Sequence, residues 1–477
     1  MRAMPTELQH IAAFALAAAH MLIAAVVTAH VLLHKRDVGS AIGWIGLAWL
    51  SPFMGSALYA MFGINRVRRR ATRLDKRRRR RGGGRAQTPI PRDDHLAPLE
   101  HAVRTLTGRR AEPDNRLTML QCGDEAYPRM LAAIAGAKRS IALSSYILRA
   151  DSAGDPFIEA LSEAHGRGVQ VRVLIDGIGS GYLYSGAYRR LRHGGVPAAR
   201  FMHSLLPWRM PFVNLRSHKK ILVVDGVHGF TGGLNIGAEN VLATNPPFPV
   251  RDTHFAVEGP VVAQLMTAFA EDWQFTTGEH LEGDAWFPDI EPDAAAGEAV
   301  ARVVTSGPDQ DVEKIEYIVL QAIASARHQI RVMTPYFLPD ERMITALELA
   351  AMRGVRVDIV LPAVGNHKLV DWATRAQIPP LLEARCHVWY NPPPFDHSKL
   401  LVIDGEWCLV GSSNWDMRSF RLNFELNVEV YHSGLARKLD ALAKRHQGEA
   451  ITLEALKKRS LPIRLRDAGA RLMLPYL

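Results

Sequence analysis

The chain has 477 residues, of which 48% are hydrophobic and 22% are charged, and its formal net charge is +10 at pH 7. This apolar content excludes an intrinsically disordered chain. The three scattered cysteines, Cys122, Cys386 and Cys408, exclude a disulfide scaffold and have no metal-ligand spacing. The sequence has no glycine-rich nucleotide loop and no carboxylate cluster, so we expect neither a cofactor nor a metal.

The first predicted elements are two apolar runs, residues 11–33 and 39–64. Each is about as long as a helix that crosses a bilayer, and the second is interrupted by Pro52. A cleavable signal peptide is the alternative, but the first run is too long and a second apolar run follows directly. We therefore predict two transmembrane helices within residues 1–65.

A basic segment follows at residues 66–85, with twelve Lys and Arg against one Asp. Its net charge of +11 exceeds that of the whole chain, so the remainder is close to neutral. The positive-inside rule places this segment, and the region after it, on the cytoplasmic side. We predict a multi-pass protein of the cell membrane, with residues 66–98 as a basic cytoplasmic linker. Its charge either attracts anionic headgroups or acts as a topology signal alone.

The remaining chain repeats one pattern of helix and strand. Amphipathic stretches at 126–137 and 312–326 each lead into an apolar strand, and Tyr146 in the first half matches Tyr336 in the second. A further helix and a parallel-type strand follow in both halves. This order predicts the α/β class, with two repeats at 99–295 and 296–477.

Each repeat carries the same polar motif, at 212–239 and 391–418. The motif reads H-x-K, four apolar residues, D, six residues, then G-G/S-x-N. Its members are His218, Lys220, Asp225 and Asn235 in the first half, and His397, Lys399, Asp404 and Asn414 in the second. Identical spacing in two places indicates that the halves build equivalent parts of one site.

The apolar residues between Lys and Asp predict a buried strand, closed by an Asp-Gly turn into a second strand. Residues two apart on a strand share a face, so each His lies beside its Lys. Asp225 and Asp404 fall on the other face, so we expect them to brace the turn. The two Asn residues follow the return strand and can offer amide donors to phosphate.

Two imidazoles, two ammonium groups and two carboxamides in one pocket would suit a phosphodiester. One neutral His can attack phosphorus while the other, protonated, gives its proton to the departing alkoxide. Each imidazole needs a carboxylate on its far nitrogen. Asp252 and Glu425 each begin a strand beyond the His of their own half, and we predict them as these partners.

The paired motifs, with SYILRADSAG, TPYFLPDERM and GSSNWDMRSFRLNFELNVEVY, resemble those of bacterial cardiolipin synthases of the phospholipase D superfamily. The resemblance implies two α/β repeats forming a pseudo-twofold sandwich around a shared active site. It also implies an inner-membrane enzyme that moves a phosphatidyl group between two phosphatidylglycerol molecules and releases glycerol. Every position of the family's two motifs has the matching residue in this sequence. The resemblance therefore implies a candidate catalytic set of His218, Lys220, Asp225, His397, Lys399 and Asp404.

Several alternatives stay open at the level of sequence. Phosphatidylethanolamine is a second possible donor, and hydrolysis or phosphatidylserine formation are alternative reactions. A nuclease is disfavoured because the basic excess sits in one linker, so no nucleic-acid partner is expected. A scaffold with a dead site would show one eroded motif, and neither is eroded. We assign His218 as the nucleophile and His397 as the acid, although sequence symmetry does not order them.

Overall fold

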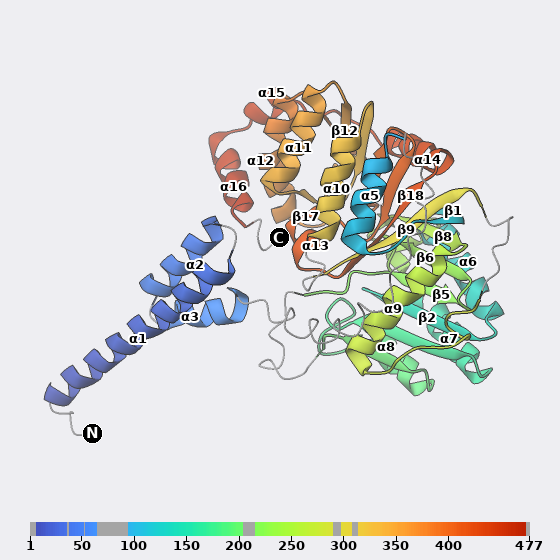
Figure 1. Ribbon diagram of the computed structural model, residues 1–477, viewed down its shortest axis with the longest axis horizontal. Coiled ribbons are helices and arrows are strands. Elements are labelled where there is room, and N and C mark those ends of the chain that lie inside the picture. Colours follow the sequence, from blue (N-terminus) through green and yellow to red (C-terminus); the bar gives the residue numbers. More distant parts are fainter. Residues whose placement is uncertain are drawn as a thin grey trace. The chain divides into compact units, whose positions relative to one another are not determined.

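The computed structural model describes residues 6–35, 38–51, 53–63, 94–203, 215–289, 297–307 and 313–473. The basic segment at 66–85 lies outside these residues. Two compact units are present, an amino-terminal unit and a larger catalytic unit (Figure 1). All the candidate site residues belong to the catalytic unit.

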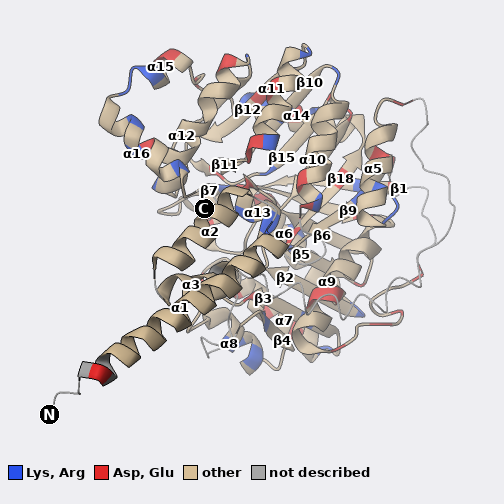
Figure 2. Cartoon of the chain, turned by 60° about the vertical axis from the view of Figure 1, so that its left-hand side comes forward, with Lys and Arg blue, Asp and Glu red and all other residues tan. Residues whose placement is uncertain are grey.

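The amino-terminal unit contains α1 (Thr6–His34), α2 (Val38–Leu50), α3 (Met54–Leu58) and the π-helical turn η1 (Tyr59–Gly63). Over residues 10–34, α1 is long and apolar enough to cross a membrane, and it is almost free of charge (Figure 2). A helix of 25 residues is about 37 Å long, more than the roughly 30 Å hydrocarbon core of a bilayer.

The prediction of a second transmembrane helix at 39–64 is not supported, because this run is broken into three short elements. The helix α2 has 13 residues and is only about 20 Å long. In the sequence, Pro52 follows α2 by two positions. A proline usually interrupts a helix because it has no amide hydrogen to donate. Among the described residues, one helix alone has the length of a membrane span.

The centre of the catalytic unit is a mixed sheet of fourteen strands. Their order is β13-β12-β10-β15-β16-β18-β9-β1-β8-β6-β5-β2-β3-β4. The first-half strands are β1 (Glu112–Gln121), β2 (Ser140–Ser145), β3 (Gln170–Asp176), β4 (Ala198–Phe201), β5 (Ile221–Val224), β6 (His228–Gly232) and β8 (Thr253–Glu258). The second-half strands are β9 (Ala299–Ser306), β10 (Gln329–Met333), β12 (Arg356–Pro362), β13 (His387–Asn391), β15 (Leu400–Ile403), β16 (Trp407–Gly411) and β18 (Glu425–Tyr431).

Counted from either edge, equivalent strands of the two repeats follow in the same order, from β4 and β13 at the edges to β1 and β9 at the centre. Strands β1 and β9 pair antiparallel there and join the two halves. In each half, three parallel strands lie at the outer edge and antiparallel strands lie toward the centre. The expected pseudo-twofold pair of α/β repeats is confirmed. Both motif strands, β5 and β15, therefore occupy equivalent positions.

Helices cover both faces of each half-sheet. The first half has α6 (Cys122–Gly136), α7 (Gly154–Gly166), α8 (Gly186–His193) and α9 (Val261–Thr277). The second half has α10 (Lys314–Ser325), α11 (Glu341–Met352), α12 (Lys368–Glu383) and α14 (Ser433–Arg445), with α5 (Ala97–Thr107), α13 (Met417–Arg421), α15 (Leu453–Lys457) and α16 (Leu461–Arg471) around it. Leu222 and Val224 pack with α6 and α7, whereas Ile221 and Val223 are equally buried on the other face. Burial on both faces explains why these strands are continuously apolar.

Short pairings join the two halves beside the motifs. Strand β7 (Val250–Arg251) pairs with β14 (Phe395–Asp396), and Ser217 bridges Phe424. The other small pair, β11 (Phe337–Leu338) with β17 (Trp415–Asp416), lies within the second half. Each motif is thus attached by main-chain contacts to the opposite repeat.

Candidate active site

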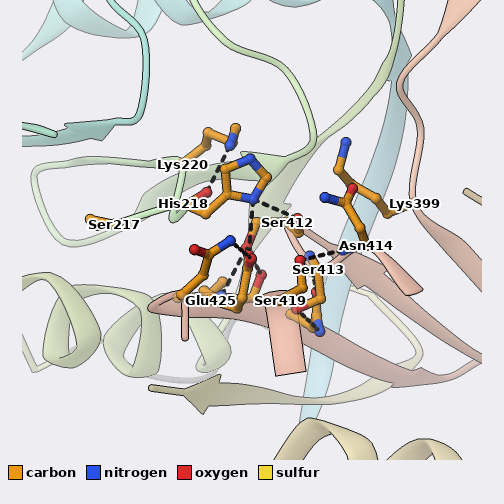
Figure 3. Close-up of polar contacts among 12 residues, drawn as sticks. Ser217, His218, Lys220, Lys399, Ser412, Ser413, Asn414, Ser419 and Glu425 are labelled. Atoms are coloured by element: carbon orange, nitrogen blue, oxygen red, sulfur yellow. Dashed lines mark hydrogen bonds and ion pairs between the residues drawn. The ribbon is translucent and has the colours of Figure 1, made fainter. Parts of the chain in front are cut away.

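His218 lies in an extended segment that enters β5, so the prediction that the motif His and Lys stand on the strand itself is wrong by a few residues. Its backbone N–H donates to the carbonyl of Phe424 at 2.8 Å. Its Nδ1 lies 3.1 Å from a carboxylate oxygen of Glu425 and 2.9 Å from the carbonyl of Ser412 (Figure 3). Both partners are acceptors, so Nδ1 carries the proton and Nε2 keeps a free lone pair.

His397 repeats this arrangement from the other side. Its backbone N–H donates to the carbonyl of Arg251 at 2.7 Å, and its Nδ1 lies 2.7 Å from a carboxylate oxygen of Asp252. In both cases the main-chain acceptor is the residue directly before the orienting carboxylate. The same main-chain pairing therefore sets both His–carboxylate contacts.

The carboxylate partners are exchanged between the halves. The sequence predicts that Asp252 and Glu425 each serve the His of their own repeat, and that pairing is wrong. Glu425 contacts His218, and Asp252 contacts His397. The correction has a topological cause, since each motif segment enters its strand beside the opposite repeat.

The two imidazoles face one cavity of about 1020 Å³. Their ring centroids are 6.3 Å apart and their planes are inclined at 86°. Tyr146 meets the ring of His218 edge-on at 5.1 Å, and Tyr336 meets His397 at 6.3 Å. Both tyrosines line the cavity. A single phosphorus atom fits between two rings at this separation.

The two motif lysines are buried. The ammonium of Lys220 donates to the carbonyl of His218 at 2.7 Å, and Lys399 donates to the carbonyl of His397. Burial, followed by the nearby charge of Lys399, lowers the pKa of Lys220 to about 7. Burial lowers the pKa of Lys399 to about 8. An anion bound between them would relieve the repulsion and restore both charges.

The two asparagines also line the cavity. The Oδ1 of Asn235 accepts the backbone N–H of Ile147 at 3.3 Å, which leaves its amide hydrogens to point elsewhere. Asn414 is buried, and among the described residues its Oδ1 has no hydrogen-bond partner. Their expected role as phosphate donors remains a prediction.

Asp225 and Asp404 do not reach the imidazoles, so their place in the candidate catalytic set is corrected here. The carboxylate of Asp225 accepts the backbone N–H groups of residues 138–140, at 2.7–3.2 Å. Asp404 accepts those of residues 327–329 at 2.7–2.9 Å. Both residues have a left-handed φ of 54°. They brace the turn after the motif strand against the start of the neighbouring strand.

We expect Asp404→Ala to lower the free energy of unfolding by roughly 2–3 kcal/mol, because three backbone donors lose one partner. Asp225→Ala is the matched change in the other half and should behave alike. Thermal unfolding of the purified variants measures the effect. A variant that keeps its melting temperature yet loses turnover would contradict the bracing role.

The two motifs differ at one position next to the orienting carboxylates, and the two carboxylates differ in pKa. Ser412 donates its hydroxyl to Glu425 at 2.5 Å, whereas the matching residue is Gly233, where a Cβ would lie 2.2 Å from a carboxylate oxygen of Asp252. Burial opposes ionisation of Glu425, but His218 and Ser412 outweigh it and lower its pKa. Burial raises the pKa of Asp252 to about 7. The pseudo-symmetric pair is therefore electrostatically unequal.

The lysine pKa values give a prediction for ligand binding. The ammonium forms that attract an anion are lost as the pH rises through about 7 and 8. A phosphonate analogue of a diacyl phosphodiester carries one charge that does not titrate between pH 6 and 9. Its affinity, measured by calorimetry, should fall as the pH rises across this range. An affinity independent of pH up to 9 would contradict the assignment.

Fold and site together define an enzyme of the phospholipase D superfamily, with two HKD-type motifs around one cavity. A family model described as "Cardiolipin synthase, PLD-like domain" matches residues 130–273 and 319–447. These segments cover more than half of the chain and fall one in each repeat. The chain belongs to this family of phosphatidyltransferases.

Curated relatives agree with the family match. A cardiolipin synthase of Geobacillus sp. strain WCH70 is 33% identical, over 93% of this chain and 90% of the relative. The major cardiolipin synthase of Bacillus subtilis strain 168 is 32% identical, over 93% of this chain and 95% of the relative. The crystal structure of phosphatidylserine synthase from Haemophilus influenzae Rd KW20 has a TM-score of 0.61 and 13% identity, and covers 80% of this chain and 100% of that one. This last similarity supports the fold alone.

Two cavity residues were missed by the sequence analysis. Arg216 precedes His218 by two positions, and Arg418 follows Asn414 by four. Both lie inside the motif segments 212–239 and 391–418. Comparison of the two motifs position by position would have found them, because the matching residues, Phe395 and Glu239, differ in charge.

Proposed function

We propose that this protein is a cardiolipin synthase that transfers a phosphatidyl group from one phosphatidylglycerol to the terminal hydroxyl of another. The observation that carries the proposal is the pair of imidazoles facing one cavity, each with its Nδ1 on a buried carboxylate. This arrangement leaves both Nε2 atoms available to one phosphorus. The curated relatives, of which the chain covers 90% and 95%, are cardiolipin synthases and so support the choice of lipid.

In the first step, Nε2 of His218 attacks the phosphorus of the donor, and the bond from phosphorus to the glycerol oxygen breaks. Protonated His397 gives its Nε2 proton to that oxygen, and glycerol leaves. In the second step, the acceptor hydroxyl gives its proton to His397 and its oxygen attacks the phosphorus. The P–N bond to His218 then breaks, and both histidines return to their starting states.

The remaining groups hold and stabilise the phosphoryl oxygens. Lys220 and Lys399 supply positive charge where negative charge develops, and Asn235 and Asn414 supply amide donors. Burial, followed by the charges of both lysines, lowers the pKa of His397 well below its ordinary value. An anionic phosphodiester offsets those charges, which favours the protonated acid that the first step requires. Asp252 orients His397, and Glu425 orients His218.

The same proposal includes the location of the enzyme. The helix α1 anchors the chain in the bacterial inner membrane, and the basic segment at 66–85 places the catalytic unit in the cytoplasm. Anionic phospholipids of that leaflet are the substrates. Accessibility of a single cysteine introduced at an exposed position of the catalytic unit, such as Glu159→Cys, distinguishes the two sides. Labelling of intact spheroplasts from outside would contradict the orientation.

The decisive experiment incubates the purified protein with phosphatidylglycerol labelled in its glycerol headgroup. Cardiolipin and free glycerol are expected in equal amounts. Phosphatidic acid as the only lipid product would indicate a phospholipase D-type hydrolase. Phosphatidylserine formed on addition of serine and a liponucleotide donor, without cardiolipin, would indicate the other transferase.

A further inference from the structure

The helix α16, near the carboxyl terminus, presents apolar side chains to solvent. Leu461 and Leu465 are 64% and 62% exposed, and Leu472, directly after the last turn and still helical, is 77% exposed. These three residues recur at intervals of four and seven, so they share one side of the helix, which we call the leucine face. An apolar helix face is normally packed against a core, and one that stays exposed marks a surface for an apolar partner.

The opposite side of α16 is the one that packs against the catalytic unit. Ala470 lies in an apolar cluster with Leu338. Buried Asp467 accepts a hydrogen bond from Arg466 at 2.8 Å, and the guanidinium of Arg466 lies 4.2 Å from the ring centre of Trp372 on α12. These contacts fix the rotation of α16 about its axis. The leucine face is therefore held away from the protein.

Basic side chains border the leucine face. Arg464 and Arg471 are seven positions apart, so they lie on the same side of α16, and both are exposed. An apolar face bordered by arginines is typical of helices that lie in the plane of a bilayer of anionic lipids. Such a bilayer accommodates both kinds of residue, because an arginine extends its guanidinium to the headgroups while its stem follows the acyl chains.

The helix α16 is also connected to the mouth of the catalytic cavity. It packs on α12, and the cluster of Ala470 includes two cavity-lining residues, Leu338 and, on the first turn of α12, Val370. Two further lining residues, Phe248 and Val364, are 84% and 64% exposed, so they stand at the mouth. The mouth is thus apolar at its outer edge, and α12 joins it to α16.

The substrates of a phosphatidyltransferase explain such a surface. The acyl chains of a phospholipid stay in the bilayer, because leaving it would expose every methylene group to water. The cavity must therefore open toward the lipid for a phosphodiester to reach the two histidines. We propose that α16 lies in the plane of the bilayer surface, with the leucine face among the acyl chains, and brings the mouth of the cavity onto the lipid. The inference rests on the membrane location in the proposed function, but not on the reaction.

Fluorescence quenching in vesicles tests this docking on the full chain. The three native cysteines are buried, so a cysteine introduced at the surface can be labelled alone with nitrobenzoxadiazole. Leu465→Cys and Phe248→Cys are labelled and reconstituted into vesicles of phosphatidylglycerol and phosphatidylcholine. A lipid with a nitroxide on its acyl chain should quench both labels at least roughly threefold more than a control label, because only labels in the bilayer meet the nitroxide.

Met352→Cys is the matched control. Met352 is an apolar residue that is 71% exposed, comparable with Leu465. It ends α11 just before β12, whereas Val364 at the cavity mouth follows the other end of the same strand. A label at Met352 should therefore remain in water.

Turnover gives a second measurement. The double variant Leu461→Ser with Leu465→Ser should lower, by about tenfold, the ratio of turnover on phosphatidylglycerol in vesicles to turnover on dissolved dihexanoyl phosphatidylglycerol. Monomeric lipid needs no docking, so the ratio removes any effect of the substitutions on the chemistry itself. Met352→Ser should keep the ratio within about twofold of wild type.

Three results would overturn the inference. The first is a label in water at either Leu465→Cys or Phe248→Cys, and the second is an unchanged ratio in the double variant. The third is a label at Leu465→Cys that is shielded from water but not quenched by the lipid, because a second copy of the chain would then cover the leucine face. Flotation separates these results from a failure of the membrane location. A protein that does not float with the vesicles refutes that location and the inference together, whereas one that floats and gives any of the three results refutes the inference alone.

Discussion

Asparagine in place of His218 should abolish phosphatidyl transfer, with a loss of at least roughly 10⁴-fold in turnover. The amide has no nucleophilic nitrogen, so no covalent phosphatidyl-enzyme forms. His397→Asn should cause a similar loss with phosphatidylglycerol, because the alkoxide of glycerol departs only when it receives a proton. Cardiolipin formation from labelled phosphatidylglycerol measures both effects.

A second donor separates the two roles. In phosphatidyl p-nitrophenol the leaving group departs without a proton, so His397→Asn should still release p-nitrophenol and accumulate the adduct on His218. His218→Asn should release none. If the adduct is instead mapped to His397, or if His218→Asn is the variant rescued by this donor, the order of the two histidines is reversed.

Removal of the charge of either orienting carboxylate should cause the next largest loss of turnover. Glu425→Gln and Asp252→Asn keep the shape of the side chain but lose the charge that supports the imidazolium and fixes its tautomer. We expect a loss of roughly 10²–10⁴-fold in turnover for each. The exchanged pairing makes the prediction specific, because Glu425→Gln should behave as a defect in the nucleophile and Asp252→Asn as a defect in the acid.

The same p-nitrophenyl donor therefore distinguishes the pairings. It should rescue the release step of Asp252→Asn and leave Glu425→Gln impaired, the opposite of what pairing within each repeat predicts. Glu239→Gln is the matched control, a carboxylate of the same cavity whose charge is engaged by Arg149. It should keep turnover within a few-fold of wild type. Equal rescue of both carboxylate variants would contradict the division of roles.

The local parts of the site could be predicted from sequence because they depend on neighbours along the chain. The spacing between Lys220 and Asp225 predicts a buried strand followed by a turn. The structure has both. The bracing contact of Asp225 follows from the same short-range geometry. The repeat itself could be seen in the sequence, whereas the joining of the two halves through β1 and β9 could not.

The pairing of carboxylates could not be predicted in this way. Whether Asp252 serves His218 or His397 depends on which repeat lies beside each motif segment, and that is decided by contacts such as Ser217 with Phe424. The prediction of a second membrane span at 39–64 failed for another reason. The composition of this run suits a membrane, but its first helix ends at Leu50. Hydropathy reports the solvent that a segment prefers, and not the continuity of its helix.

The exchanged carboxylates make each repeat chemically incomplete without the other. A first repeat expressed alone would have an imidazole whose Nδ1 has lost Glu425, and an aspartate at 252 with no ring to orient. Two copies of one repeat, associated through the central strand pair, would supply both missing partners to each other. The single chain thus holds in covalent form the mutual dependence that two such copies would have, since the imidazole of each repeat is oriented by a carboxylate of the other.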